Sequence, residues 1–280
     1  MNKLILARFA AVFTAGVLTA CGMSSKKGES GDDITVSSAA AEPVMITANG
    51  VKTDFSALSN ECHGYGQGVQ VDEKNRTLGA LDFNHTYGKY NAKAIREDSK
   101  KITLTFDQGY ENGYTAQILD TLKEKNVKAV FFLVQDYAER NPELVQRMID
   151  EGHTVANHSV HHYSMPSLTE ETCRAEITGL HEYMKENFGV EMTLFRPPMG
   201  EFSEKSLAVT ADCGYETVLW SFAYADWNVD DQPEPSAALE KLKKAAHPGA
   251  VYLLHSVSAT NAQILGDLID GMRSDGFELT

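Results

Sequence analysis

Short apolar runs alternate with amphipathic helical patterns over residues 101–280. The first run, Ile102 to Phe106, has the alternating apolar and β-branched side chains of a strand, and it ends at Asp107 before a glycine-rich turn. Further strands are predicted at 129–134, 153–157, 193–196, 216–220, 250–254 and 277–280. Helices are predicted from Tyr114 onward and over 141–151, 169–188, 203–213, 236–246 and 261–275. Because strands and helices alternate without reversal, the pattern predicts an α/β fold with parallel strands, closed into a distorted (β/α) barrel.

The start of the chain lacks this alternation. Lys3 and Arg8 precede an uncharged, mostly apolar segment, 9–20, which is too short to span a bilayer and predicts an export signal. Leu18-Thr19-Ala20-Cys21 resembles the lipobox of bacterial lipoproteins. That resemblance implies cleavage before Cys21, lipidation of its sulfur and anchoring on the outer face of the bacterial cell membrane. In the alternative, the protein is simply secreted and Cys21 is incidental.

These patterns divide the chain into four segments. Residues 1–21 are predicted to be the signal peptide and lipobox, and residues 22–43, rich in Ser, Ala and Gly, a flexible linker. Residues 44–100 carry scattered aromatic residues without a sustained period, and we expect an N-terminal extension packed against the main domain. The main domain is predicted to be 101–280, which is long enough for one large core.

Composition narrows the possible partners. The apolar content of 42% and charged content of 23% are ordinary for a globular protein. The net charge of −14 argues against nucleic acid and against adhesion to anionic polymers. We expect a monomer. Beyond Cys21, the cysteines Cys62, Cys173 and Cys213 leave two possibilities open, one pair with a free thiol or three buried thiols.

Polar side chains follow the predicted strands at the points where the strands end. Because the carboxyl ends of parallel strands share one rim of a barrel, these residues predict an active site. They are Asp107, Gln108, Asn157, His158, Arg196, Ser221, Asp226 and His255. In the alternative for the first of them, Asp107 only caps a helix or shapes the turn.

Three kinds of side chain at this rim suggest chemistry. His158 and His162 are four residues apart, so a helical turn would place both on one face for a divalent metal ion, with His161 as a surface residue. Arg196 leaves its strand before two prolines, and such a rigid arginine can clamp a carboxylate, for which Asp107 is the candidate. His255 ends an apolar strand and suits proton transfer near neutral pH.

Five short motifs together resemble one family. In chain order they are TFDQG (105–109), HSVHH (158–162), RPPMG (196–200), Asp226-Trp227 and LLH (253–255). They resemble the motifs of polysaccharide deacetylases with a NodB-homology domain, carbohydrate esterase family 4. GYENGYT at 109–115 and AHPGAVYLLH at 246–255 look most like the branch that makes muramic δ-lactam in spore cortex peptidoglycan.

The resemblance implies a role for each motif residue. His158 and His162 would hold a divalent metal, Zn, Mn or Mg, that lowers the pKa of a water molecule. Asp107 would be the general base, oriented by Arg196, and His255, tuned by Asp226, would protonate the departing amine. The metal and a backbone N–H near Met199 would stabilise the oxyanion. The implied substrate-binding residues are Trp227, Leu253, Met199 and Tyr110, of which Trp227 and Leu253 would line the acetyl pocket or else belong to the core.

Gln108 departs from the family pattern. Most members carry a second aspartate there, which completes a metal site of two histidines and one carboxylate. A neutral amide is a poorer ligand for a dication, so metal affinity should fall, and either an extra water or Asp107 would take the position. The δ-lactam branch tends to carry an amide there too. Metal identity and metal dependence therefore stay open.

The resulting prediction is a metal-assisted N-deacetylase of peptidoglycan glycan strands, acting on N-acetylmuramic acid and leading to muramic δ-lactam. One alternative is a deacetylase of N-acetylglucosamine or another glycan. The other is a carbohydrate-binding relative that has lost turnover, with Gln108 as the lesion. The complete set of Asp107, His255, Arg196 and Asp226 argues against that last alternative.

Overall fold

The computed structural model describes residues 54–280. The predicted signal peptide, lipobox and linker, and residues 44–53 of the predicted extension, lie outside the described residues. The described residues belong to one compact unit. Among the described helices, none has the length and apolar character needed to cross a bilayer.

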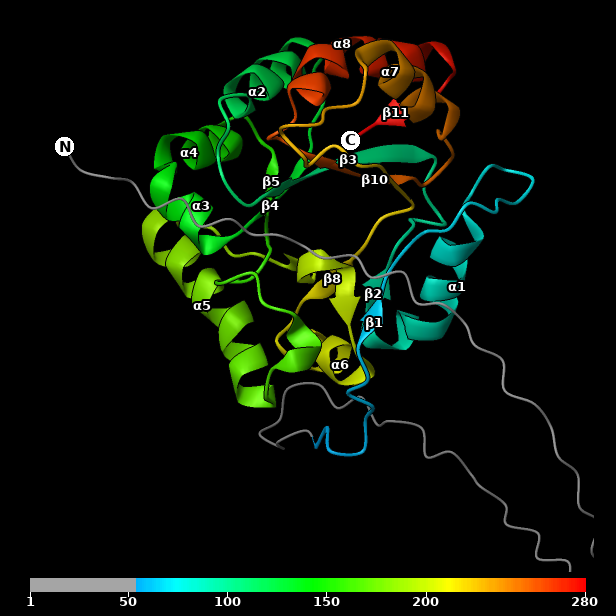
Figure 1. Cartoon of the computed structure of the whole chain (residues 1–280). Helices are drawn as coiled ribbons and strands as arrows, with labels where there is room; N and C mark the ends of the chain where they lie inside the picture. The colour runs from blue at the N-terminus through cyan, green and yellow to red at the C-terminus, as the bar shows by residue number, and fades with distance from the viewer. Residues whose placement is uncertain (1–53) are drawn as a thin grey trace, which may run out of the picture. The chain divides into compact units, whose positions relative to one another are not determined.

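The core is a curved sheet in which every pairing is parallel (Figure 1). Along the sheet the order is β2 (Ala92–Lys93), β8 (Glu216–Val218), β6 (Leu194–Phe195), β5 (Thr154–Asn157), β4 (Val130–Leu133), β3 (Lys101–Gln108), β10 (Val251–His255) and β9 (Phe222–Ala223). The short β11 (Glu278–Leu279) pairs with the start of β3. The described strands at the two ends, β2 and β9, do not pair with each other, so the barrel is an open one. The predicted distorted barrel is confirmed.

Successive side chains of β3 point to opposite faces of the sheet, and each face borders a different core. Leu104 and Phe106 point outward and join the large core between sheet and helices. The other face looks into the barrel, where a small apolar cluster fills the interior below the rim. Its members are Phe132, Ala156, Val218 and Val251, with Val130 and Leu194 at its edge. Asp107 lies on β3 above this cluster, opposite Phe132 of β4 in the strand register.

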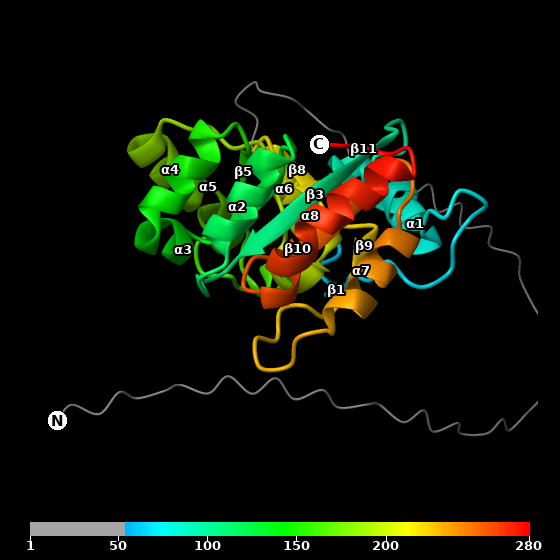
Figure 2. The ribbon, with the colours of Figure 1, turned by 90° about the horizontal axis from the view of Figure 1, so that it is seen from above.

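The helices cover the outside of the sheet (Figures 1 and 2). They are α2 (Thr115–Glu124), α3 (Gln135–Arg140), α4 (Pro142–Asp150), α5 (Glu170–Phe188), α6 (Glu204–Asp212), α7 (Pro235–Lys244) and α8 (Ala259–Ser274). Their starts follow local chemistry: Thr169 caps α5 through the Thr172 N–H, and Ser203 forms a capping box with Ser206. Helix α3 was not predicted, because six residues give too short a pattern.

Residues 54–100 are built into the same unit. They contain β1 (His63–Gly64), paired antiparallel with β7 (Glu201–Phe202), then α1 (Leu78–Tyr87), the 3₁₀ turn η1 (Gly88–Tyr90) and β2. Strand β2 is an edge strand of the main sheet, beside β8. The stretch between β1 and α1 bonds to the backbone leading into β9: Tyr65 donates to the Trp220 carbonyl at 2.6 Å, and Thr77 to that of Ser221 at 3.1 Å.

The three described cysteines are free thiols. Cys62 is exposed, Cys173 is buried and Cys213 is partly buried. Of the two possibilities left open by the sequence, the paired one is absent from the described residues, and the thiols are not all buried.

Candidate active site

Arg196 and Asp107 form a buried ion pair at the rim. Nη1 of Arg196 donates to Oδ1 of Asp107 at 2.6 Å. Two further hydrogen bonds hold the guanidinium: Nε donates to the Val218 carbonyl at 3.0 Å and Nη2 donates to the Leu219 carbonyl at 3.2 Å. The guanidinium also lies 4.0 Å from the centre of the Phe132 ring. Arg196, which is completely buried, therefore presents a fixed positive charge to one oxygen of Asp107.

This environment keeps Asp107 ionised. Burial alone would raise the pKa of Asp107, but Arg196, His158 and His255 outweigh it and hold that pKa below its usual range. Because Oδ1 is bound by Arg196, Oδ2 is the oxygen left to accept a proton. Oδ2 lies 3.6 Å from Nε2 of His158. The carboxylate is thus charged, oriented and open on one side, as a general base must be.

His255 is held by a second buried carboxylate. Its Nδ1–H donates to Oδ1 of Asp226 at 2.7 Å, and its backbone N–H donates to Oδ2 at 2.8 Å. Burial alone would lower the pKa of His255, but Asp226 and Asp107 outweigh it and raise that pKa. With Nδ1 engaged, Nε2 is the nitrogen that can exchange a proton with a ligand.

Asp107 and His255 are direct neighbours across two strands. In the parallel pairing of β10 with β3, His255 lies opposite Asp107. Neighbouring strands are separated by only about 5 Å, so a carboxylate and an imidazole on the same side of the sheet share one reaction space. Their pKa values move in opposite directions, which is the pattern of an acid and base pair.

The segment His158–His162 is a loop and not a helical turn, so that part of the prediction was wrong. Ser159 and His162 have left-handed φ angles of 71° and 59°, which a helix excludes. The predicted meeting of the two rings still occurs, because the loop folds back: the centres of the His158 and His162 rings are 4.9 Å apart. His161 points elsewhere, with its side chain 59% exposed.

The two imidazoles have the chemistry of metal ligands. Burial lowers the pKa of His158 to about 4 and also lowers the pKa of His162, so both rings are neutral with a lone pair to offer. Nδ1 of His158 donates to the Arg196 carbonyl at 2.8 Å, which fixes the tautomer and leaves Nε2 as the free donor atom. The two rings could therefore contribute two nitrogen ligands to a divalent ion.

The side chain of Gln108 makes different interactions from those of a metal-binding carboxylate. Its Nε2 donates to Oγ of Ser256 at 2.5 Å, while its Oε1 is buried without a hydrogen-bond partner. Among the residues that the structure describes, no group of three or more His, Cys, Asp or Glu side chains is arranged to hold a metal ion. A metal here would therefore depend on two histidines, with Asp107 or Gln108 as the available further oxygen donors.

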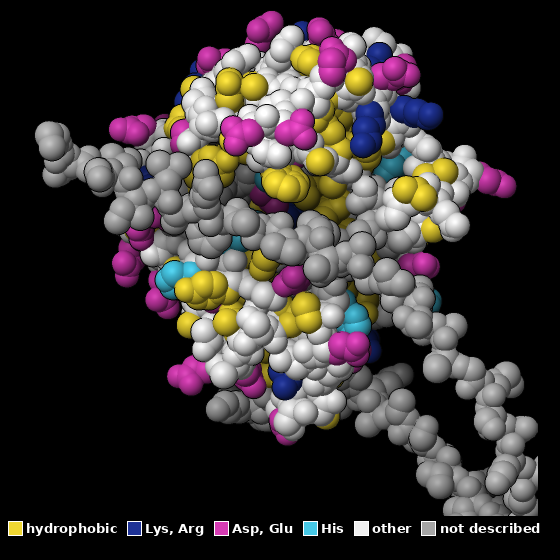
Figure 3. Space-filling view, in the orientation of Figure 1, with side chains coloured by type: hydrophobic (Ala, Val, Ile, Leu, Met, Phe, Trp, Pro, Cys, Tyr) yellow, Lys and Arg dark blue, Asp and Glu magenta, His cyan; other side chains and the backbone are white. Residues whose placement is uncertain are grey.

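The predicted substrate-binding residues divide into two groups. Tyr110, Met199 and Trp227 are 52%, 55% and 55% exposed, in the loops that follow β3, β6 and β9. Leu253 is buried within β10 and belongs to the main core. Figure 3 shows hydrophobic side chains bordering a hollow on the face that Figure 1 views.

The structure adds two residues that the sequence did not suggest. Asn261, at the start of α8, donates to Oδ2 of Asp226 at 2.5 Å and so supports the residue that holds His255. Glu176, in the middle of α5, receives the backbone N–H and the ring N–H of His161. Both contacts join residues distant in sequence, and neither position carries a local motif.

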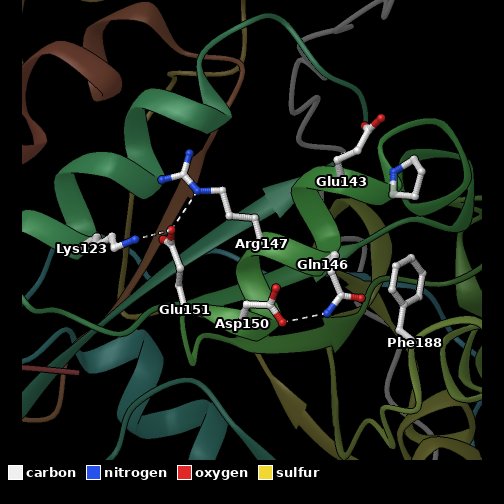
Figure 4. A pocket seen from close by; sticks show the side chains of 8 residues that line it. Lys123, Glu143, Gln146, Arg147, Asp150, Glu151 and Phe188 are labelled. Carbon is white, nitrogen blue, oxygen red and sulfur yellow. Dashed lines mark hydrogen bonds and ion pairs between the residues drawn. The ribbon is translucent and has the colours of Figure 1, made fainter.

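A surface pocket lies away from this rim, beside α2 and α4 (Figure 4). It is lined by Lys123, Pro142, Glu143, Gln146, Arg147, Asp150, Glu151 and Phe188. Its cations are already paired: Lys123 and Arg147 both contact Glu151, at 3.4 and 2.9 Å. Both cations of the pocket are therefore already engaged in ion pairs with carboxylates of the chain.

Comparison with known proteins decides the family. The family described as polysaccharide deacetylase matches residues 83–218. Peptidoglycan-N-acetylmuramic acid deacetylase PdaA of Bacillus subtilis (strain 168) is 39% identical over 223 residues, which cover 79% of this chain and 84% of PdaA. The chain belongs to the polysaccharide deacetylase family. The resemblance found in the motifs is confirmed, and the chain is a hydrolase of that family.

Structures of the family agree with the fold. The structure of Bacillus subtilis PdaA, described as a family 4 carbohydrate esterase, superposes with a TM-score of 0.75 at 36% identity, covering 80% of this chain and 96% of that one. A peptidoglycan-N-acetylglucosamine deacetylase of Bacillus cereus is 32% identical over 170 residues, 61% of each chain. A polysaccharide deacetylase of this family generally depends on a metal ion.

Proposed function

We propose that this polysaccharide deacetylase is a metal-assisted N-deacetylase of peptidoglycan aminosugars and that its substrate is N-acetylmuramic acid. One observation carries the proposal: a carboxylate clamped by Arg196 and an imidazole clamped by Asp226 lie in register on neighbouring strands. Amide hydrolysis needs both groups, because water must lose a proton to attack and the amine must gain one to leave.

Asp107 is the general base in this proposal. Its free Oδ2 accepts the proton of the attacking water, while Arg196 keeps Oδ1 in place. Since the pKa of Asp107 is held below its usual range, the base is ionised near neutral pH. The backbone at Met199, with φ 60° and ψ 5°, turns directly after Arg196, and its N–H is the candidate donor to the developing oxyanion.

His255 is the general acid. Because the pKa of His255 is raised, a larger fraction of the ring is protonated at a given pH. Nε2 delivers this proton to the departing nitrogen. Asp226 holds the ring in the required tautomer and orientation through Nδ1. Asn261 in turn holds Asp226, so the acid is oriented by a chain of buried hydrogen bonds.

His158 and His162 are the residues that would hold a divalent metal ion. When bound, such an ion acts as a Lewis acid that polarises the acetamide carbonyl and lowers the pKa of an adjacent water. Imidazole nitrogen suits Zn better than Mg, which prefers oxygen donors. The unpartnered Oε1 of Gln108 would add a neutral donor in place of the usual carboxylate.

The choice of N-acetylmuramic acid rests on similarity. PdaA, at 39% identity, acts on that sugar by its name, and the GYENGYT and AHPGAVYLLH segments resemble the δ-lactam branch. Freeing the amine beside the lactyl carboxylate of muramic acid would permit ring closure to the lactam. The runner-up is N-acetylglucosamine, the sugar named for the Bacillus cereus relative. We further propose an exported monomer, tethered to the membrane by lipidated Cys21.

The test is acetate release by the purified protein from peptidoglycan strands freed of their peptides, with chitin oligomers as the substrate that lacks muramic acid. Each assay is run with chelator and with added Zn²⁺, Mn²⁺ or Mg²⁺. We expect release from the peptidoglycan strands only, abolished by chelator. Release from chitin oligomers, with or without release from the peptidoglycan strands, would favour the runner-up. Binding without release from either substrate would favour the carbohydrate-binding alternative.

A further inference from the structure

Exposed hydrophobic side chains gather at the active-site rim. Eight large ones are exposed in the part of the chain that the structure describes, and three of these lie within 69–78. The other five all lie in the segments that follow β3, β5, β6 and β9: Tyr110, Tyr163, Met199, Trp227 and Val229. Exposed apolar surface concentrated at one place marks a binding surface. Tyr163 and Val229 have no role in the site described above, and of these two only Tyr163 is aromatic.

Tyr163 directly follows the loop at 158–162, and its ring stacks on the ring of His161. It is 50% exposed, and its ring centre is 5.2 Å from that of His161 with an angle of 15° between the planes. One face of Tyr163 is thus covered by His161, which leaves the other face for a ligand. Because His162 is the adjacent residue, the Cα atom of Tyr163 is about 4 Å from that of a candidate metal ligand.

A buried carboxylate fixes this ring pair. Glu176 of α5 is 4% exposed, and its Oε1 accepts from Nδ1 of His161 at 2.6 Å. Its Oε2 accepts the His161 backbone N–H at 2.8 Å, and its own carbonyl accepts the Val160 N–H at 3.1 Å. Burying a carboxylate costs free energy unless it is fully bonded, so this support is a built feature of the loop. We call Glu176, His161 and Tyr163 together the ring platform.

We propose that the ring platform binds a pyranose ring of the glycan strand by stacking, beyond the sugar that loses its acetyl group. One face of a pyranose is lined with C–H groups, which pack against the electron-rich face of an aromatic ring. A rigid exposed ring provides this contact at little entropic cost, since Tyr163 is already held in place. The identity of the ligand as a glycan rests on the proposed function; the existence of the platform does not.

Calorimetric titration of the full-length protein tests the platform. The probes are peptide-free peptidoglycan fragments, a disaccharide and an octasaccharide, and the variants are Tyr163→Ala, Tyr163→Phe and His161→Ala. Val69→Ala, which shortens an exposed apolar side chain outside the ring platform, is the control. We expect Tyr163→Ala to weaken octasaccharide binding about tenfold and to leave disaccharide binding unchanged. Tyr163→Phe and Val69→Ala should bind as the wild type does.

The His161→Ala variant tests the support of the ring. Because His161 acts through Tyr163, its loss should weaken octasaccharide binding and add nothing to Tyr163→Ala in the double variant. The proposal is overturned if Tyr163→Ala binds the octasaccharide normally, if it weakens both fragments equally, or if the wild type binds no octasaccharide. Acetate release is read separately: binding that depends on Tyr163 without any release would refute the deacetylase and leave the platform standing.

Discussion

His255 lies directly opposite Asp107 in the parallel pairing of β10 with β3. Each of the two side chains is held by its own oppositely charged partner, Asp107 by Arg196 at 2.6 Å and His255 by Asp226 at 2.7 Å. The strands thus set the spacing of base and acid, and the partners set their charge states. Each partner can therefore be tested by its own substitution.

The acid can be removed without removing the binding surface. We expect His255→Ala to lower kcat by about 10²–10⁴-fold, the usual contribution of a general acid, with a much smaller change in KM. Steady-state kinetics of acetate release measure both constants. His85→Ala, an exposed histidine on α1, is the control. A defect confined to KM would contradict the acid role.

The loss of activity at alkaline pH should follow the deprotonation of His255. Since its pKa is raised and the protonated form is the active one, activity is full below that pKa and is lost as pH rises through it. Asp226→Asn removes the charge that raises the pKa, while burial, which lowers it, remains. The alkaline limb of the kcat profile should therefore move to lower pH, together with a lower maximum. An unmoved limb in this variant would show that another group controls it.

Arg196 should not be replaceable by lysine. Its guanidinium serves Asp107 and the carbonyls of Val218 and Leu219 together, and it stacks on Phe132. An ammonium cannot reproduce this planar set, so buried acceptors are left unpaired in Arg196→Lys. We expect the free energy of unfolding to fall by about 2–4 kcal/mol, measured by urea denaturation, and activity to fall as well. Exposed Arg140→Lys is the matched control, and equal stability of the two variants would argue against the buried clamp.

Gln108 allows a test of the metal site that does not depend on turnover. Gln108 is completely buried, so Gln108→Asp introduces a buried charge and should lower the melting temperature of metal-free protein. Added Zn²⁺ should raise that temperature more in the variant than in the wild type, because a carboxylate is the better ligand. Thermal melts with chelator and with metal measure both effects. If Zn²⁺ stabilised both proteins equally, position 108 would have no part in metal binding.

The strand-end residues could be predicted because periodicity alone places them on one rim. Asp107, His158, Arg196 and His255 each end an apolar run, and parallel strands bring such ends together. The loop at 158–162 could not be predicted, because its left-handed turns at Ser159 and His162 have no glycine to signal them. Strand β2 has two residues and gains its place only by pairing with β8, more than 100 positions later in the chain.

The supporting residues Glu176 and Asn261 could not be predicted either, for a related reason. Glu176 and Asn261 look like ordinary polar positions on amphipathic helices. Their carboxylate and amide become functional only when α5 and α8 bring them against the His161 loop and Asp226. Contacts of this kind depend on the packing of elements and leave no local pattern.

The most direct test of the central claim compares the wild type with Asp107→Asn on peptide-free peptidoglycan strands. We expect acetate release by the wild type and none by the variant, while circular dichroism and glycan binding stay the same for both. Asparagine keeps an oxygen for Arg196 but cannot take a proton, so only the base is lost. Normal acetate release by Asp107→Asn would contradict the account.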